Sequence, residues 1–263
     1  MATSLLQSST SSAFSTIIKP KFNQPSSSYK PTKITMFQTK KISSHIDVAA
    51  HIEHALSVLK PPTSVSDPMH HQIADIPRSM APALCIAACK AVGGKTEQAI
   101  EAASAIHLLH VATFTNRNSN LPQGYELLAK LNDPNSSNPG NILRVIMEMS
   151  RAMGPEGMVQ GKYEEMRCEM GWMDHLCEKK EGGLYACAAA SGAILGGGTD
   201  EEVETLRIYG HYVGMMHGMM LNGTKDRVKD FKYLALNQLQ GLQLEKSEVI
   251  PRFMNKTCSV LGL

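Results

Sequence analysis

The sequence predicts an all-α protein, and three observations support this prediction. Hydrophobic residues make up 43% of the 263 residues, whereas aromatic residues contribute only 5%. Methionine is frequent, with 16 residues. Ala, Leu and Met favour helices, and runs of β-branched residues are short. Apolar residues recur at helical spacing, and no stretch alternates between apolar and polar residues as a half-buried strand does. We therefore expect one core built from many helices.

Proline and glycine mark where the first predicted helices begin and end. Apolar residues recur at helical spacing over residues 46–59, and two prolines end that helix. Pro82 suits the first turn of a helix that runs to about Val92, where two glycines stop it. The next helix is expected over residues 96–113, and a polar loop follows it.

Loops rich in Asn, Ser and Pro separate the middle helices. A short helix is predicted over residues 125–131, before a clear loop over residues 132–140. Asn141 suits the cap of a helix that runs through Ala152. The apolar residues of this helix fall on one face: Ile142, Val145, Ile146 and Met149.

Glycine-rich breaks divide the C-terminal half. Helices are predicted over residues 158–166, 173–180 and 184–195. Thr199 and Glu202 form a capping-box pattern that opens a long helix toward Leu221. The last substantial helix is expected over residues 225–239.

The first 46 residues have the composition of a targeting leader. They contain six Lys, no Arg and no Asp or Glu, and they are rich in Ser and Thr. Such a leader is typical of an organelle transit peptide, with a chloroplast favoured over a mitochondrion; a merely disordered tail is the alternative. The domain division is therefore a leader over residues 1–46 and a helical domain over residues 47–263.

The helical domain is mildly acidic. Without the six leader lysines, 20 basic and 24 acidic residues remain, so the formal charge is −4. A domain with this charge has no excess of basic residues of the kind that binds nucleic acid. No apolar run approaches the roughly 18 residues that a membrane-spanning helix needs. The six cysteines include no Cys-x-x-Cys pair and no zinc-type spacing with histidine, so we assign no metal and expect free thiols.

Several motifs together resemble those of prenyl diphosphate synthases, over most of residues 47–245. They are Leu84–Gly94, Ile106-His107, Arg144-Val145-Ile146, Gly154–Gly157, Gly192–Gly197 and Leu206-Arg207. Within that family the chain is similar to the plant small subunit of heteromeric geranyl(geranyl) diphosphate synthase. The features that carry this closer resemblance are Met69-His70-His71, Cys85-x-x-x-Cys89, Ile106–His110 and Gly218-Met219-Met220. The resemblance implies an isoprenoid synthase-type helical bundle.

The acidic residues of the family's two aspartate motifs are missing from this chain. The resemblance places the first motif on Val111, Ala112 and Arg117, and the second on Leu221, Asn222 and Lys225. Only Arg78 is charged within residues 76–81, where the family has a basic cluster. Lys180 matches a family lysine, but Glu181 stands in place of the threonine beside it.

These replacements argue against autonomous catalysis. Prenyl transfer ionises an allylic diphosphate, and the leaving group needs metal ions and cationic side chains to stabilise it. Magnesium prefers carboxylate and phosphate oxygens, so without both carboxylate sets we expect no catalytic residue and no cofactor bound by this chain.

The resemblance therefore implies a non-catalytic regulatory subunit. It would bind a catalytic geranylgeranyl diphosphate synthase subunit in the plastid stroma, as a heterodimer or larger complex. The partner would supply magnesium, and its product would be biased toward the ten-carbon geranyl diphosphate for terpenoid biosynthesis. The alternative is an inactive scaffold or a lipid-binding paralogue without a stable synthase partner.

Two features of the sequence bear on a partner interface. Cys85 and Cys89 share one helix face among small residues, and the resemblance implies a contact with the catalytic subunit. Ordinary core packing is an equal alternative, because a free Cys behaves as a small hydrophobe. Cys187 begins a second such pair, in which the other position is Ser191. The chain is also shortened between Phe114 and Tyr125, within a helix that helps to form the family's subunit interface.

Other His and Met residues have plainer readings. His107 and His110 lie one helical turn apart, and with no evident third ligand they read as ordinary helix histidines. The Met-rich stretch over residues 215–220 fills the core or lines a partner surface or lipid channel, with core filling favoured.

Overall fold

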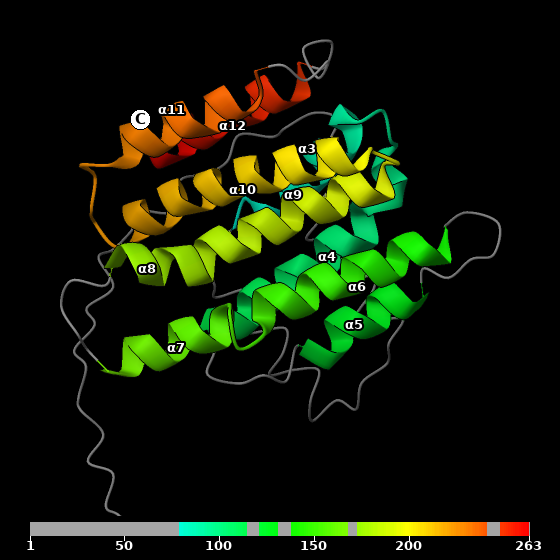
Figure 1. The fold of residues 1–263 in the computed structure, drawn as a ribbon, viewed down its shortest axis with the longest axis horizontal. Coiled ribbons are helices and arrows are strands. Elements are labelled where there is room, and N and C mark those ends of the chain that lie inside the picture. The colour runs from blue at the N-terminus through cyan, green and yellow to red at the C-terminus, as the bar shows by residue number, and fades with distance from the viewer. Residues whose placement is uncertain (1–78, 115–120, 131–137, 168–172, 241–247, 263) are drawn as a thin grey trace, which may run out of the picture. The chain divides into compact units, whose positions relative to one another are not determined.

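Helices form the regular structure of the residues that a computed structural model describes, namely 79–114, 121–130, 138–167, 173–240 and 248–262 (Figure 1). These residues contain no strand, in agreement with the all-α prediction. All of them belong to one structural unit, Lys41–Leu263. The predicted leader and the predicted helix over residues 46–59 lie outside the described residues.

The first described helices begin and end close to where proline and glycine predict. Helix α3 spans Ala81–Ala91 with a proline in its first turn, and Gly93 follows it with a φ of +93°. Helix α4 spans Thr96–Phe114, and α5 spans Leu121–Lys130, so α5 starts four residues earlier than expected.

Helix α6 spans Pro139–Met153 and corrects the predicted cap. The capping residue is Asn138, whose side-chain oxygen accepts a hydrogen bond from the Gly140 amide at 2.9 Å. Pro139 sets the first helical φ and moves the start of the helix before Asn141. The Asn141 side chain instead donates to the Ile194 carbonyl at 3.2 Å, which ties α6 to α9.

Two predicted helices are one continuous helical segment. Helix α8 (Met173–Cys177) runs into a π-helical turn, η2 (Glu178–Gly182), and then into α9 (Gly183–Leu195). Residues at both junctions keep helical backbone angles. Helix α7 (Met158–Arg167) precedes this segment in the chain.

The C-terminal helices confirm one prediction and correct another. Helix α10 (Asp200–Leu221) opens with the predicted capping box, in which Thr199 and Glu202 each accept a hydrogen bond from the other's backbone amide. Helix α11 spans Val228–Gln238. The expectation that this is the last substantial helix is wrong, because α12 (Val249–Leu261) follows. Its buried residues recur at helical spacing: Ile250, Phe253, Met254 and Cys258.

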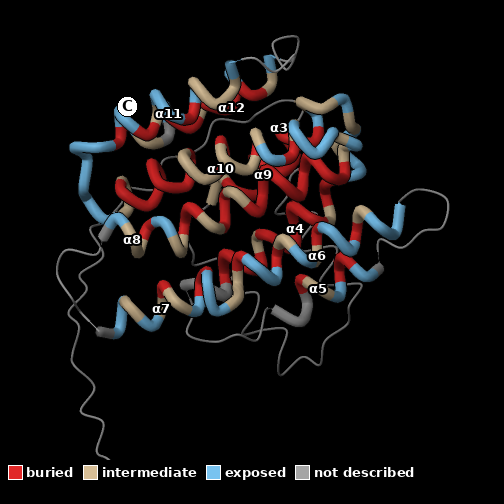
Figure 2. Tube along the Cα trace, in the orientation of Figure 1, coloured by how far each residue is buried: buried red, intermediate tan, exposed pale blue. Residues whose placement is uncertain are grey.

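Helix α9 lies at the centre of the described core and contacts α3, α4, α6 and α10. It is buried along almost its whole length (Figure 2). Where α9 meets α3, a Cβ atom on Gly192 would lie 2.0 Å from the Cys85 carbonyl oxygen. Where α10 meets η2, a Cβ atom on Gly214 would lie 2.3 Å from the Glu181 carbonyl oxygen. Glycine is therefore required at both crossings, and the backbones there are almost in contact.

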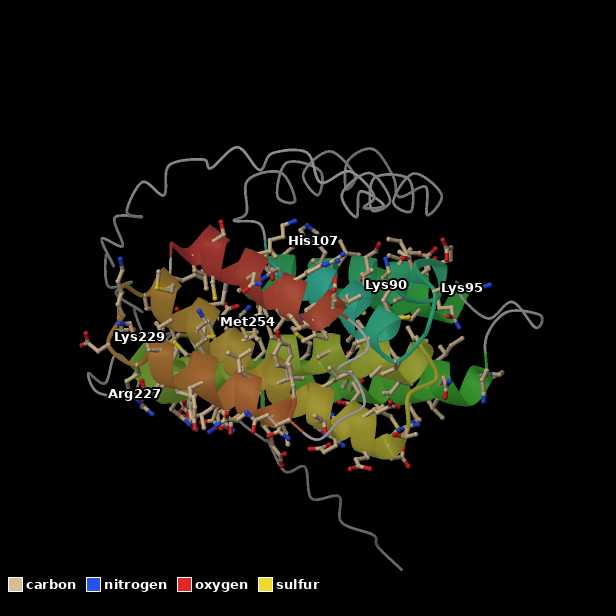
Figure 3. The ribbon with its side chains drawn as sticks, turned by 90° about the horizontal axis from the view of Figure 1, so that it is seen from above. Lys90, Lys95, His107, Arg227, Lys229 and Met254 are labelled. Atoms are coloured by element: carbon tan, nitrogen blue, oxygen red, sulfur yellow. The ribbon has the colours of Figure 1, made fainter. Side chains whose placement is uncertain are left out.

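Side chains on the outer helices separate into core and surface groups. Met254 of α12 lies toward the middle of the helices, whereas Arg227 and Lys229 lie at the edge (Figure 3). Met215, Met216 and Met219 of α10 are buried, as the core-filling reading expects. None of the described helices combines the length and apolar character needed to cross a membrane.

Candidate functional site

The first motif segment lies at the C-terminal end of α4. Val111 is fully buried, so its apolar side chain packs in the core. Ala112 follows on the same helix, and Arg117 lies outside the described residues. Neither valine nor alanine has a side-chain oxygen for a metal ion.

The second motif segment lies where α10 ends. Leu221 is the last residue of the helix, and Lys225 is exposed in the following turn. The Asn222 amide nitrogen donates to the Gly218 carbonyl at 2.8 Å and to the Cys177 sulfur at 3.5 Å. These bonds direct the side chain back onto the helix end, so Asn222 acts as a C-terminal cap.

Magnesium does not fit the donor set at these positions. The described side chains of the two segments include no carboxylate, and Lys225 adds a positive charge beside Asn222. Elsewhere in the part of the chain that the structure describes, no group of three or more His, Cys, Asp or Glu side chains is arranged to hold a metal ion.

A group of polar residues near these segments was missed by the sequence analysis. We call Glu181, His217, His110 and Tyr185 the buried polar cluster; they come from η2, α10, α4 and α9, and all four are buried. The Glu181 carboxylate lies 3.5 Å from Nδ1 of His217, and the rings of Tyr185 and His217 are 5.2 Å apart. The Tyr185 hydroxyl accepts a hydrogen bond from the Met80 amide at 3.0 Å.

The surroundings of Glu181 favour the ionised form of its carboxyl. Burial alone would raise the pKa of its carboxyl, but the contact with His217 and the charges of His110 and Lys180 lower the pKa below its usual value. Burial also raises the pKa of the Tyr185 hydroxyl, which therefore stays protonated. The sequence signal for this cluster was an acidic residue, Glu181, separated by two glycines from an apolar, alanine-rich run.

The predicted partner-binding cysteines lie inside the described core. Cys85 and Cys89 on α3 and Cys187 on α9 are all buried. Burial raises the pKa of Cys85, raises that of Cys89 to about 11 and raises that of Cys187 to about 12, so the three remain thiols near neutral pH.

The contacts of these thiols are within the chain. The Cys89 thiol donates to the Lys95 carbonyl at 3.2 Å, and the Cys187 sulfur lies 3.8 Å from the Ser191 hydroxyl. This placement favours the core-packing alternative for the side chains, and a direct partner contact stays a prediction.

The largest exposed apolar side chains gather on two neighbouring helices and on α11. We call the first group the α6–α7 apolar residues, each more than half exposed: Leu143, Met147, Val159, Tyr163 and Met166. On each helix they are spaced by three or four positions, so they share one face. Exposed apolar surface of this kind is typical of a protein–protein contact.

A small cavity of about 210 Å³ lies between α6, η2, α9 and α10. Arg207 and Glu148, which form an ion pair, line this cavity together with Cys187. Its size lies below the roughly 300–1,000 Å³ of ordinary small-molecule sites. The charged lining also does not suit a prenyl chain.

Solved structures identify the class of fold. The geranylgeranyl pyrophosphate synthetase of the archaeon Geoglobus acetivorans superimposes with a TM-score of 0.64 over 82% of this chain and 97% of that one, at 14% sequence identity. The helical arrangement is therefore that of isoprenyl diphosphate synthases, which confirms the predicted bundle.

Two closer relatives identify the group within this class. The geranyl diphosphate synthase small subunit of Antirrhinum majus is 37% identical, with a TM-score of 0.71 over 79% of this chain and 96% of that one. A heterodimeric geranylgeranyl pyrophosphate synthase small subunit of Cannabis sativa, named as chloroplastic, is 35% identical over 84% of this chain and 96% of its own length. No protein-family model matches the chain. The chain belongs to the polyprenyl synthase family, among the small subunits of its heteromeric members.

Proposed function

We propose that this chain is a non-catalytic regulatory subunit. It binds a catalytic geranylgeranyl diphosphate synthase subunit in the plastid stroma and biases the product of that subunit toward geranyl diphosphate. The observation that carries the proposal is the loss of the acidic residues from both motif segments in a chain that keeps the fold. The names of its small-subunit relatives, which include "heterodimeric" and "chloroplastic", support the partner and the compartment.

Cofactor binding belongs to the partner in this proposal. Val111, Leu221 and Asn222 offer no anionic oxygen, so magnesium and the diphosphates are held by the catalytic subunit alone. Binding of this chain can change the product of the catalytic subunit only if the contacts it makes favour one conformation of that subunit over another. The α6–α7 apolar residues offer a surface for such contacts.

Co-expression with a catalytic subunit tests this proposal. The complex is measured by size-exclusion chromatography with light scattering, and the ten- and twenty-carbon products are measured by chromatography after dephosphorylation. We expect a stable complex, a higher share of ten-carbon product than the catalytic subunit makes alone, and no product from this chain alone with magnesium. A complex with an unchanged product ratio would reject the product bias but keep the subunit role.

The alternative function is an inactive scaffold or lipid-binding paralogue. It predicts that no synthase subunit forms a stable complex with this chain. The small, charge-lined cavity between α6 and α10 does not suit a lipid, so a lipid ligand would have to bind elsewhere on the chain. Magnesium-dependent synthesis by the purified chain alone would reject both readings.

A further inference from the structure

The crossing of η2 and α10 forces a charged side chain into the core. A Cβ atom on Gly218 would lie 3.1 Å from Cγ of Glu181, and one on Gly214 would meet the Glu181 carbonyl oxygen. Because glycines clear this space, the aliphatic part of Glu181 lies directly on α10. Its side chain is 7% exposed, and that of His217 is 8% exposed. The carboxylate therefore cannot be solvated by bulk water.

A buried carboxylate is tolerated only when a positive charge or several hydrogen bonds compensate it. The groups that face Glu181 come from every neighbouring element: His217 on α10, His110 on α4, Tyr185 on α9, Cys177 on α8 and Lys180 on η2 itself. Only the two histidines and the lysine can carry a positive charge. Of these, His217 lies within 3.5 Å of the carboxylate, and Lys180 pairs with Glu165 on α7 at 3.0 Å.

The position of this pair in the fold is informative. His217 precedes Leu221 by one helical turn, and His110 directly precedes Val111. The pair therefore lies one helical turn from the second segment without acidic residues, and His110, whose charge acts on Glu181, adjoins the first. We propose that Glu181 and His217 form an internal charge pair that latches α10 onto η2, so that the folded chain needs no bound cation or diphosphate. This inference concerns the free chain and does not depend on a partner.

Single neutral substitutions test the latch in thermal unfolding of the full chain. E181Q and H217Q each remove one charge and leave the other buried, so we expect each to lower the unfolding midpoint by about 6 °C or more. The double variant should lose about as much as one single variant rather than the sum, because the two residues share one interaction. Additive losses, or midpoints within about 2 °C of the wild type, would overturn the proposal.

A control and a second double variant keep the test decisive. E165Q removes a carboxylate from the exposed pair with Lys180, and it should change the midpoint by less than about 2 °C. If the single variants do not fold, the double variant E181M/H217F still tests whether the two residues form a charge pair. Replacing both charges by apolar groups of similar size should restore a folded chain, since no lone charge remains. A double variant that is as unstable as the single variants would contradict the pairing.

Thermal unfolding in the presence of magnesium and diphosphate tests whether the folded chain is independent of these ligands. Magnesium chloride with inorganic diphosphate, each at millimolar concentration, should shift the midpoint of the wild-type chain by less than about 1 °C. A stabilising rise of about 3 °C or more would show that these ions bind the folded state and would overturn this part of the proposal.

Discussion

Helices α9 and α7 place their apolar side chains differently. Helix α9 is surrounded by other helices and buries nearly all of its side chains. Helix α7 buries Met158 and leaves Val159, Tyr163 and Met166 exposed. A helix that is apolar on all sides must be enclosed, whereas apolar residues on an outward face have no partner within the core. The comparison teaches that helices of this chain enclose α9, whereas the outward face of α7 is the place to look for a contact with another protein.

The largest expected effect tests how tightly the interior is packed. Gly192→Ala places a Cβ atom 2.0 Å from the Cys85 carbonyl oxygen, and backbone atoms of α3 cannot move aside as a side chain does. We expect a loss of about 3 kcal/mol or more in the free energy of unfolding, measured in urea by circular dichroism.

Gly183→Ala is the matched control for this change. A Cβ atom there would lie 3.8 Å from its nearest neighbour, the Glu178 carbonyl oxygen of η2, so the variant should change the free energy of unfolding by no more than about 1 kcal/mol. Equal stability of the two variants would mean that α3 and α9 are not held in close contact.

The next effect tests the outward face. Tyr163→Ala combined with Met166→Ala removes two large exposed side chains of α7. If the proposed subunit role holds, affinity for the catalytic subunit should fall by about 100-fold in titration calorimetry, because buried aromatic side chains dominate interfaces. The unfolding midpoint should change by less than about 2 °C, since neither side chain belongs to the core.

Tyr233→Ala on α11 is the control, because Tyr233 is also exposed but lies on another helix. Its affinity for the partner should remain near that of the wild type. An equal loss of affinity in this variant would place the interface on α11 as well.

A smaller effect is expected from acid. The pKa of Glu181 is lower in the folded chain than its usual value, so the folded state holds this proton less tightly than the unfolded state. The resulting stabilisation is present above the unfolded pKa of about 4.3 and is lost as the pH falls through the lower folded pKa. Urea unfolding from pH 7 to pH 3 should therefore show a shallower loss of stability for E181Q than for the wild type. Parallel curves for the two proteins would contradict the assignment.

The smallest effect tests local structure outside the packed core. Thr199→Ala removes the hydroxyl that accepts a hydrogen bond from the Glu202 amide at the start of α10. We expect a loss of about 1 kcal/mol in the free energy of unfolding. Thr205→Ala, within the same helix, should lose less, because alanine favours a helix interior. An equal loss in both variants would mean that the cap contributes nothing beyond helix propensity.

Local signals explain why much of the fold could be predicted. The start of α3 follows from Pro82, and the start of α10 follows from Thr199 and Glu202, because each signal acts within a few residues of the backbone group that it satisfies. The cap of α6 was placed three residues late, because two asparagines competed and Pro139 decided between them. Helix α12 was missed although its buried residues recur at helical spacing.

The site depended on contacts that no local signal contains. The two segments without acidic residues are placed by the resemblance to the family, and their correspondence to its aspartate motifs stays a prediction. Glu181 and His217 are 36 positions apart and meet only because Gly214 and Gly218 let α10 approach η2. The burial of Cys85 and Cys187 likewise depends on how α3 crosses α9.

The π-helical turn Glu178–Gly182 sets the rotational phase between the helical turns on either side of it. Each residue of a regular helix advances the chain by about 100° around its axis. A π-helical turn holds about one residue more than a regular turn, so a one-residue deletion within it can be absorbed by a change to α-helical hydrogen bonds. A deletion in the regular turns on either side would instead turn α8 by that angle relative to α9 and carry Cys177 away from Gly218. Natural variation in this region should therefore remove residues only within the π-helical turn, and it should keep Glu181, whose carboxylate is buried.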